Sequence, residues 1–224
     1  HMLTRPAVAP ARGRGFTLIE MIVTVAVLAL ILAMAMPSIG TWVDNTRIRG
    51  ATEALQSGMQ SARMEAIRRN QPVSFYLVSS SASDPSTLNN SCALSSTSGS
   101  WVISASSPAG KCASMNPTSC SSTVPGKCSL AQRAIGDAGA RVQVSAGYST
   151  NVTDMTAIGS AATTITFDGL GRVANSTSAI NRLRVTGPNA NTSYVDLMLV
   201  VDAGGGVRMC DPRSSIAAND PRKC

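Results

Sequence analysis

Glu20 is the residue of this 224-residue chain whose type and position most clearly raise a chemical question. It is a carboxylate within an otherwise apolar run from Phe16 to Met36, where the other polar residues are Thr17 and Thr24. About 21 residues at about 1.5 Å each make a helix of about 30 Å, one hydrocarbon thickness. A carboxylate in such a helix is costly toward the bilayer centre, so we expect it to have a partner.

The chain offers that partner if it is cut after Gly15. Phe16 then carries a new α-amine, and residues four apart lie on the same helix face, so Glu20 can pair with its own amine or with that of a neighbouring copy. The alternative is a membrane anchor whose glutamate simply lies near the interface.

The residues around Glu20 resemble the class III signal of type IV pilins and type II secretion pseudopilins. The matching features are Gly15-Phe-Thr-Leu-Ile-Glu20, a short basic leader before it, a long apolar helix after it, and Pro37. The resemblance implies that prepilin peptidase cuts between Gly15 and Phe16 and methylates the new N-terminus. It also implies that Glu20 is the assembly glutamate and that Pro37 kinks the helix.

The predicted domain order follows from the same features. Residues 1–15 form the leader, in which His1-Met2 is interpreted as a cloning remnant, and residues 16–36 form a transmembrane and assembly helix. An amphipathic continuation covers 37–70, and a β-rich periplasmic head covers 71–224. Arg12 and Arg14 before the span predict a cytoplasmic N-terminus. We therefore expect a single-pass inner-membrane protein that moves into a pilus or pseudopilus, with the filament tip as one expected position.

The pattern after Pro37 predicts an α+β fold. Apolar residues recur at helical spacing from Trp42 to Ala66, with charged residues on the other face, and Asn70-Gln71-Pro72 ends the helix. A single antiparallel sheet is expected to pack on this helix. The predicted strands are Val73–Val78, Trp101–Ser104, Arg141–Ser145, Thr164–Phe167, Arg182–Thr186 and Val195–Val201, followed by a last strand within Gly204–Cys210.

Three further segments resemble one particular family of pilins and pseudopilins. Ala62–Val73 resembles the helix-to-strand junction of the GspH/FimT family of minor pilins and pseudopilins, Phe167–Val173 its strand-turn-strand element, and Gly204–Cys210 its closing turn and last strand. The chain is identified as a member of that family. This implies a type IV pilin-like fold, with a long N-terminal helix packed on an antiparallel β-sheet head.

All the cysteines fall in the part expected to be exported, and their number is even, which predicts disulfides. Four lie in or beside a polar insertion over residues 79–129 that has too little apolar surface to order itself. We predict that Cys210 pairs with Cys224, because the segment between them needs tying back, and that the other four form two bridges, for which three connectivities stay open. The full set is Cys92, Cys112, Cys120, Cys128, Cys210 and Cys224.

Enzymatic chemistry is not expected. After the leader the chain has no histidine, which excludes catalytic triads that need one, and it has no phosphate-binding loop. Asp168, Asp196, Asp202 and Asp211 lack the spacing of a calcium loop. We predict no catalytic residue, no metal and no cofactor.

The net charge is +7, of which Arg5, Arg12 and Arg14 lie in the leader, so the remainder carries about +4. Basic residues concentrate at the C-terminal edge, where they predict DNA binding through phosphates; the alternative is a solvated tail. DNA-binding members of the family are associated with a Gly-Arg-x-Arg pattern near the last strand, and here Gly205-Gly206-Val207-Arg208 retains only the second arginine. The predicted DNA-binding residues are Arg208, Arg213, Arg222 and Lys223.

The expected function is therefore that of a minor pilin that assembles into, primes or caps a type IV pilus. Alternatives are a minor pseudopilin of a type II secretion system and a DNA-binding pilin for natural transformation. The cysteine-rich insertion and the tail after Cys210 favour a pilus tip component. Expected partners are prepilin peptidase, other major and minor pilins or pseudopilins, the inner membrane, DNA and a tip adhesin.

Overall fold

The computed structural model describes residues 15–81, 83–115, 129–136, 141–151, 154–188, 194–217 and 219–224, and the side chains of 34–39 lie outside the description. The chain divides into two compact units, residues 1–40 and 41–224. Helix α1 (Leu18–Arg69) contributes its N-terminal part to the first unit and the remainder to the second.

Within the residues described, no helix has the combined length and apolarity needed to cross a membrane.

Helix α1 ends in a Schellman motif, where the sequence predicts its end. Asn70 takes a left-handed backbone conformation with φ 49°. Its amide donates to the carbonyl of Ile67, and the amide of Gln71 donates to the carbonyl of Ala66, both at 3.2 Å. These bonds satisfy carbonyls that the last helical turn leaves free. Pro72 then follows at a position that cannot continue a helix.

The strands of the second unit form two antiparallel sheets. The four-stranded sheet has the order β3-β2-β1-β6, and the five-stranded sheet has the order β5-β4-β7-β8-β9. The strands of the first sheet are β1 (Val73–Val78), β2 (Ser100–Ser104), β3 (Ser129–Arg133) and β6 (Thr164–Phe167). Those of the second are β4 (Gln143–Tyr148), β5 (Ser160–Ala161), β7 (Arg182–Thr186), β8 (Leu197–Val201) and β9 (Val207–Cys210).

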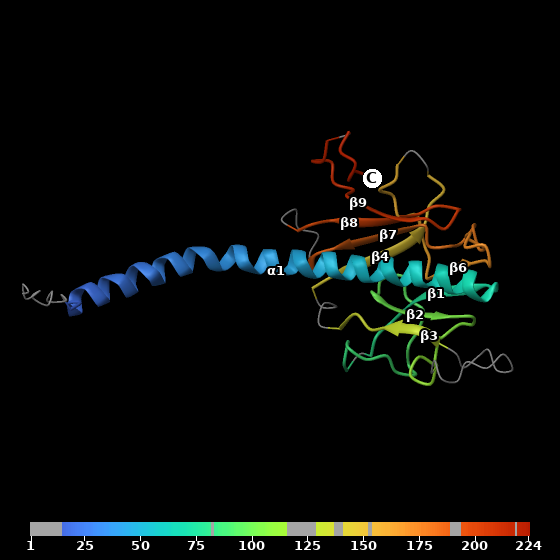
Figure 1. Ribbon diagram of the computed structural model, residues 1–224, viewed down its shortest axis with the longest axis horizontal. Coiled ribbons are helices and arrows are strands. Elements are labelled where there is room, and N and C mark those ends of the chain that lie inside the picture. Colours follow the sequence, from blue (N-terminus) through green and yellow to red (C-terminus); the bar gives the residue numbers. More distant parts are fainter. Residues whose placement is uncertain are drawn as a thin grey trace, which may run out of the picture. The chain divides into compact units, whose positions relative to one another are not determined.

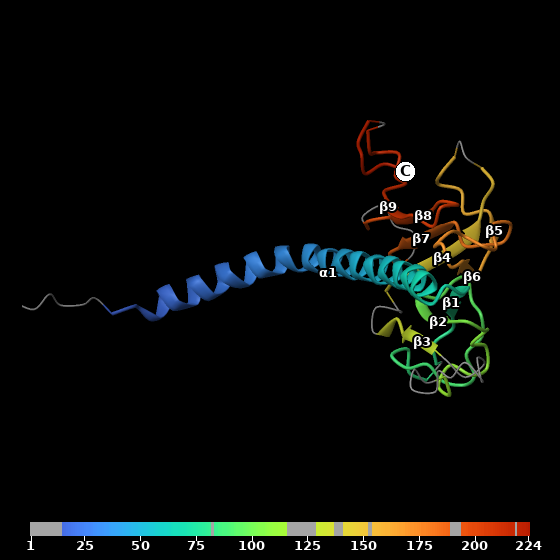
Figure 2. The same ribbon diagram turned by 45° about the vertical axis from the view of Figure 1, so that its right-hand side comes forward.

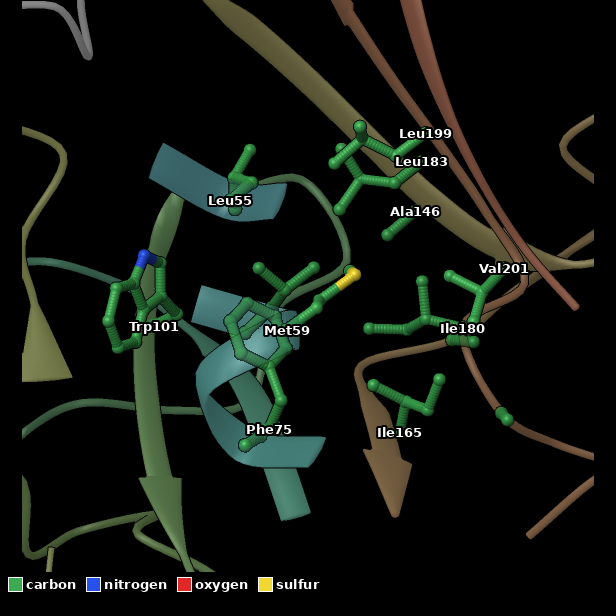
Figure 3. Packing of buried hydrophobic residues seen from close by; sticks show 14 of the residues in the cluster. Leu55, Met59, Phe75, Trp101, Ala146, Ile165, Ile180, Leu183, Leu199 and Val201 are labelled. Carbon is green, nitrogen blue, oxygen red and sulfur yellow. The ribbon is translucent and has the colours of Figure 1, made fainter. Parts of the chain in front are cut away.

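The main core lies where the part of α1 after Thr41 runs between the two sheets (Figures 1 and 2). In Figure 3, Leu55 and Met59 of α1 lie between two groups of side chains, one from each sheet. Phe75 and Trp101 belong to the four-stranded sheet, with ring centroids 5.6 Å apart. On the other side the labelled residues include Ala146, Leu183 and Leu199 of the five-stranded sheet.

The outer face of each sheet is covered by a segment that a disulfide closes. All six residues of β1 are buried, because Tyr76 and Val78 pack outward against the bridge between Cys92 and Cys112. On the other sheet, Met198, Val200 and Cys210 pack outward with Ile158 and Cys224, and Cys210 is bonded to Cys224. Neither sheet therefore has a bare outer face over these residues.

The α+β prediction is confirmed, but the expectation of a single sheet was wrong. The predicted strands over β1, β6 and β7 agree residue for residue, whereas β3 and β5 were missed. β5 has two residues and is exposed, and β3 begins at Ser129, where the sequence was interpreted as the end of the insertion. Such short polar strands exist because neighbouring strands pair with them, which no local pattern records.

Candidate functional site

The peptide bond predicted to be cut lies just before α1. Gly15, Phe16 and Thr17 precede the first helical residue, Leu18, and all of them are exposed. Non-helical, exposed chain is what a protease requires of its substrate. The basic leader residues Arg12 and Arg14 lie outside the described residues.

Glu20 takes part in a capping box at the start of α1. The amide of Glu20 donates to Oγ1 of Thr17 at 3.3 Å, and the amide of Thr17 donates to Oε2 of Glu20 at 3.5 Å. The amide of Met21 closes the first helical bond to the Thr17 carbonyl. Thr17 is thus the N-cap residue and Glu20 the third helical residue, the reciprocal arrangement that satisfies free amides of a first turn. The sequence Thr17-x-x-Glu20 contains this signal, and the sequence interpretation missed it.

The capping box has a consequence for the carboxylate. It turns Glu20 toward the chain start, where cleavage before Phe16 would create an amine, and leaves it exposed. The helix dipole adds positive potential at this end of α1, which also favours a carboxylate there. One side chain therefore satisfies its own helix and presents a negative charge beside the predicted new N-terminus.

The apolar side chains that follow are exposed around the whole helix. Phe16 and Leu18 are 78% and 79% exposed, and each of the large apolar residues through Leu32 is more than half exposed. Burying one such side chain fully is worth about 1.5–3 kcal/mol. A helix that is apolar on all sides is stable only inside a membrane or among other helices. The backbone of Pro37 lies within α1.

The second candidate region is the C-terminal edge, where aspartates neutralise two of the predicted DNA-binding residues. Arg213 makes a bidentate pair with Asp211, with Nε–Oδ1 at 3.0 Å and Nη2–Oδ2 at 2.6 Å. Arg222 makes the same arrangement with Asp220, at 3.0 and 2.7 Å. Lys223 donates from Nζ to the carbonyl of Ile216 at 3.2 Å. Arg213 and Arg222 thus lie near each other on this segment, but their guanidinium groups are used largely in internal pairs.

These pairs are reflected in the pKa values. The guanidinium of Arg222 lowers the pKa of Asp220 to about 2. Burial alone would raise the pKa of Asp211, but the hydrogen bonds from the side chain and amide of Arg213 outweigh it, and the pKa lies below its ordinary value. Both carboxylates are therefore ionised at neutral pH.

Arg208 is in a different environment, on the same sheet face as Arg182. Arg182 was not among the site residues predicted from the sequence. Arg182 on β7 pairs with Val200, and Val200 pairs with Arg208 on β9. The two arginines thus lie on one row of the outer sheet face. Arg182 is 5% exposed. It donates to the carbonyl of Asn181 and to the sulfur of Met155. No acidic partner of either arginine occurs among the described residues. Burial and then the charge of Arg208 lower the pKa of Arg182.

The disulfide prediction can be assessed for two of the three bridges. Cys210 is bonded to Cys224, as predicted, and Cys92 is bonded to Cys112, which is one of the pairings that the sequence left open. Cys120 and Cys128 lie outside the described residues. Within the part of the chain that is described, no group of three or more His, Cys, Asp or Glu residues could hold a metal ion.

Comparisons with known proteins identify the family to which this chain belongs. The family model of the type II transport protein GspH matches residues 51–205. The model of the prokaryotic N-terminal methylation motif matches residues 11–36, which include Gly15, Phe16 and Glu20. No curated protein matches the chain. Among solved structures, the type IV minor pilin FimU of Pseudomonas aeruginosa PAO1 is 16% identical and aligns with a TM-score of 0.39, over 73% of this chain and 92% of that one. At that score the structural likeness carries no functional argument.

Proposed function

This chain belongs to the family of the type II transport protein GspH, and we propose that its function is assembly: it enters a type IV pilus as a minor pilin and primes or caps the filament. The observation that carries this proposal is the exposed carboxylate of Glu20, turned toward the chain start at the head of an uncovered apolar helix. The methylation-motif match over residues 11–36 implies processing by prepilin peptidase and other pilins as partners.

We further propose that the apolar segment 16–36 anchors the protein in the inner membrane before assembly, with the second unit in the periplasm. Leaving the bilayer is then possible only where equivalent helices replace the lipid around the exposed side chains. Glu20 would meet the α-amine at Phe16 of a neighbouring copy in this packing, and the pairing would neutralise both charges. Prepilin peptidase would supply that amine by cutting after Gly15.

The test separates the charge of Glu20 from its role as a helix cap. Glu20→Gln keeps a side-chain acceptor for the Thr17 amide and loses the charge, whereas Thr17→Val loses the cap hydroxyl and keeps the charge. In cells that assemble the filament, we expect Glu20→Gln to lower incorporation by about tenfold or more, since an uncompensated amine must then be buried. Thr17→Val should incorporate nearly as well as the parent. Normal incorporation of Glu20→Gln would refute the charge-pairing role.

A pseudopilus of a type II secretion system is the alternative filament, since pilus and pseudopilus subunits share this start motif. The disulfide-closed segments that cover the outer faces of both sheets favour the pilus, because the surface of a pilus is exposed outside the cell. Crosslinking the assembled chain to its neighbours in cells separates the two. Recovery with secretion pseudopilins alone would establish the alternative.

DNA binding is a second candidate function, supported by Arg208 and not by the whole basic edge. Arg208 and Arg182 place two cationic groups on one row without an acidic partner among the described residues. A phosphate group can reach the exposed Arg208 as a counter-ion, and the buried Arg182 adds positive potential on the same row. Arg208→Gln should therefore weaken duplex binding at low salt by about tenfold, and the matched change Arg222→Gln should have little effect, because Asp220 already neutralises Arg222. Equal effects of the two changes would argue against this assignment.

A further inference from the structure

A pocket of about 760 Å³ opens on the outer face of the five-stranded sheet. This volume is within the range that small-molecule sites occupy. The described residues that line it come from β4, β7, the segment before β8 and the segment after β9. The lining residues whose side chains carry hydrogen-bonding, charged or aromatic groups are Ser145, Arg184, Tyr194, Asp196, Arg213 and Ser214.

The floor of the pocket is formed by paired strands of the five-stranded sheet, whose hydrogen bonds hold it in place. Ser145 on β4 pairs with Arg184 on β7, and Arg184 pairs with Met198 on β8, so their side chains share the outer face. Arg184 forms a fork with Asp196, in which Nε lies 3.0 Å from both carboxylate oxygens. A planar pair of this kind holds its remaining donors and acceptors in fixed directions.

The aromatic ring of Tyr194 is also held in place. It lies against Gly187, where any side chain would collide with the ring. The next residue, Val195, donates its amide to Oδ1 of Asn45 on α1 at 2.7 Å. The ring therefore enters the pocket wall from a fixed backbone position.

The opposite wall is the C-terminal segment closed by the bridge between Cys210 and Cys224. The amide of Asp211 donates to the carbonyl of Arg222, and the amide of Cys224 donates to the carbonyl of Asp211. Asp211 in turn holds Arg213 by a bidentate pair. The disulfide thus closes the segment that forms one wall of the pocket.

The charges in the pocket are balanced. Arg184 is neutralised by Asp196, and Arg213 by Asp211. An anionic ligand would have to compete with carboxylates that are already bound, and an apolar ligand would desolvate both pairs without replacing their hydrogen bonds. A neutral ligand with many hydroxyl groups avoids both costs. It does not displace the carboxylates, and its hydroxyls can donate to the aspartates and accept from the arginines.

We propose that this pocket binds a neutral saccharide. Adjacent sugar hydroxyls match the paired donors and acceptors of the two arginine–aspartate forks, and Ser145 and Ser214 add hydroxyls on both sides. The Tyr194 ring supplies a flat surface for the C–H face of the sugar ring. The pocket uses neither Glu20 nor the start of α1, so the proposal is independent of filament assembly.

The experiment measures binding of glucose, galactose, mannose and N-acetylglucosamine to the full chain by saturation-transfer NMR. The chain is kept in a detergent without a sugar headgroup, so that the detergent does not compete. Ser145→Tyr fills the pocket from an exposed position on β4. Ser160→Tyr is the matched control, because Ser160 is exposed on β5 of the same sheet and is not among the residues that line the pocket. Thermal melting of both variants checks that they fold.

We expect at least one of these sugars to bind, with affinity weakened about tenfold or more by Ser145→Tyr and unchanged by Ser160→Tyr. Tyr194→Ala should weaken binding as well, and Arg172→Gln, which breaks an ion pair away from the pocket, should not. The proposal is overturned if no sugar binds the parent chain, if Ser145→Tyr binds as well as the parent, or if sulfate and acetate bind at the pocket while the sugars do not.

Discussion

The Nε of Arg63 lies 2.9 Å from the carbonyl oxygen of Gly171, although Arg63 belongs to α1 and Gly171 to the turn after β6. Its Nη2 also donates to the carbonyl of Gly204, in the turn between β8 and β9, at 3.2 Å. The two turns meet at Gly205, where φ is +81° and any side chain would collide with the Gly171 carbonyl. One arginine therefore joins the helix to a turn of each sheet.

Replacing Arg63 by Met should lower the free energy of unfolding by about 2 kcal/mol, since hydrogen bonds to a charged group are worth about 1.5–3 kcal/mol and these are partly exposed. The measurement is chemical unfolding of the full chain in detergent. Arg49→Met is the control, because Arg49 is exposed on the same helix. Equal losses from both variants would mean that Arg63 acts only as a surface charge.

Gly58 and Gly50 of α1 should respond to the same substitution in opposite directions. A Cβ at Gly58 would lie 2.8 Å from the Phe75 ring and 2.9 Å from the Trp101 ring, whereas a Cβ at Gly50 meets nothing within 4 Å. Overpacking costs about 1–3 kcal/mol, and Gly to Ala in an open helix position gains about 0.4–1 kcal/mol. Thermal melting should thus show Gly58→Ala below the parent and Gly50→Ala at or above it.

Acid should loosen the C-terminal segment through Asp211. Its pKa lies below the ordinary value of 3.8 because the Arg213 hydrogen bonds outweigh burial. A depressed pKa contributes stability above the ordinary value, and that stability is lost as pH falls below it toward the folded pKa. The difference in melting temperature between the parent and Asp211→Asn should therefore stay constant down to about pH 5 and shrink as pH falls through about 4 and below. A difference that stays constant would show that Asp211 acts without its charge.

The two described disulfides should differ in what their removal exposes. Changing Cys210 and Cys224 to Ser opens a loop of about 15 residues, worth roughly 3 kcal/mol in the chain-entropy model. It should increase amide exchange in β8 and β9, because Cys210 and Cys224 pack on that sheet. Changing Cys92 and Cys112 to Ser should instead increase exchange in β1 and β2. Exchange that increases in both sheets with either pair would contradict the separate packing of the two coverings.

Features set by neighbours along the chain could be predicted from the sequence. The end of α1 at Asn70, the strands β1, β6 and β7, the processing motif around Gly15 and Glu20, and the pairing of Cys210 with Cys224 all have local signals. Helical period, strand alternation and capping depend on residues a few positions apart, so the sequence by itself determined them.

Tertiary structure alone decided which segments meet. No local pattern indicates that the strands divide into two sheets around α1, that β1 is buried on both faces, or that Arg63 reaches two turns at Gly171 and Gly204. The basic C-terminal edge is a further case, since the charges of Arg213 and Arg222 could be counted in the sequence but their pairing with Asp211 and Asp220 could not. Hydrogen bonds and ion pairs depend on distances of about 3 Å. For Arg63 and Gly171 folding brings distant segments within that distance, and for Arg213 and Asp211, two residues apart, it fixes the backbone conformation that lets the side chains meet.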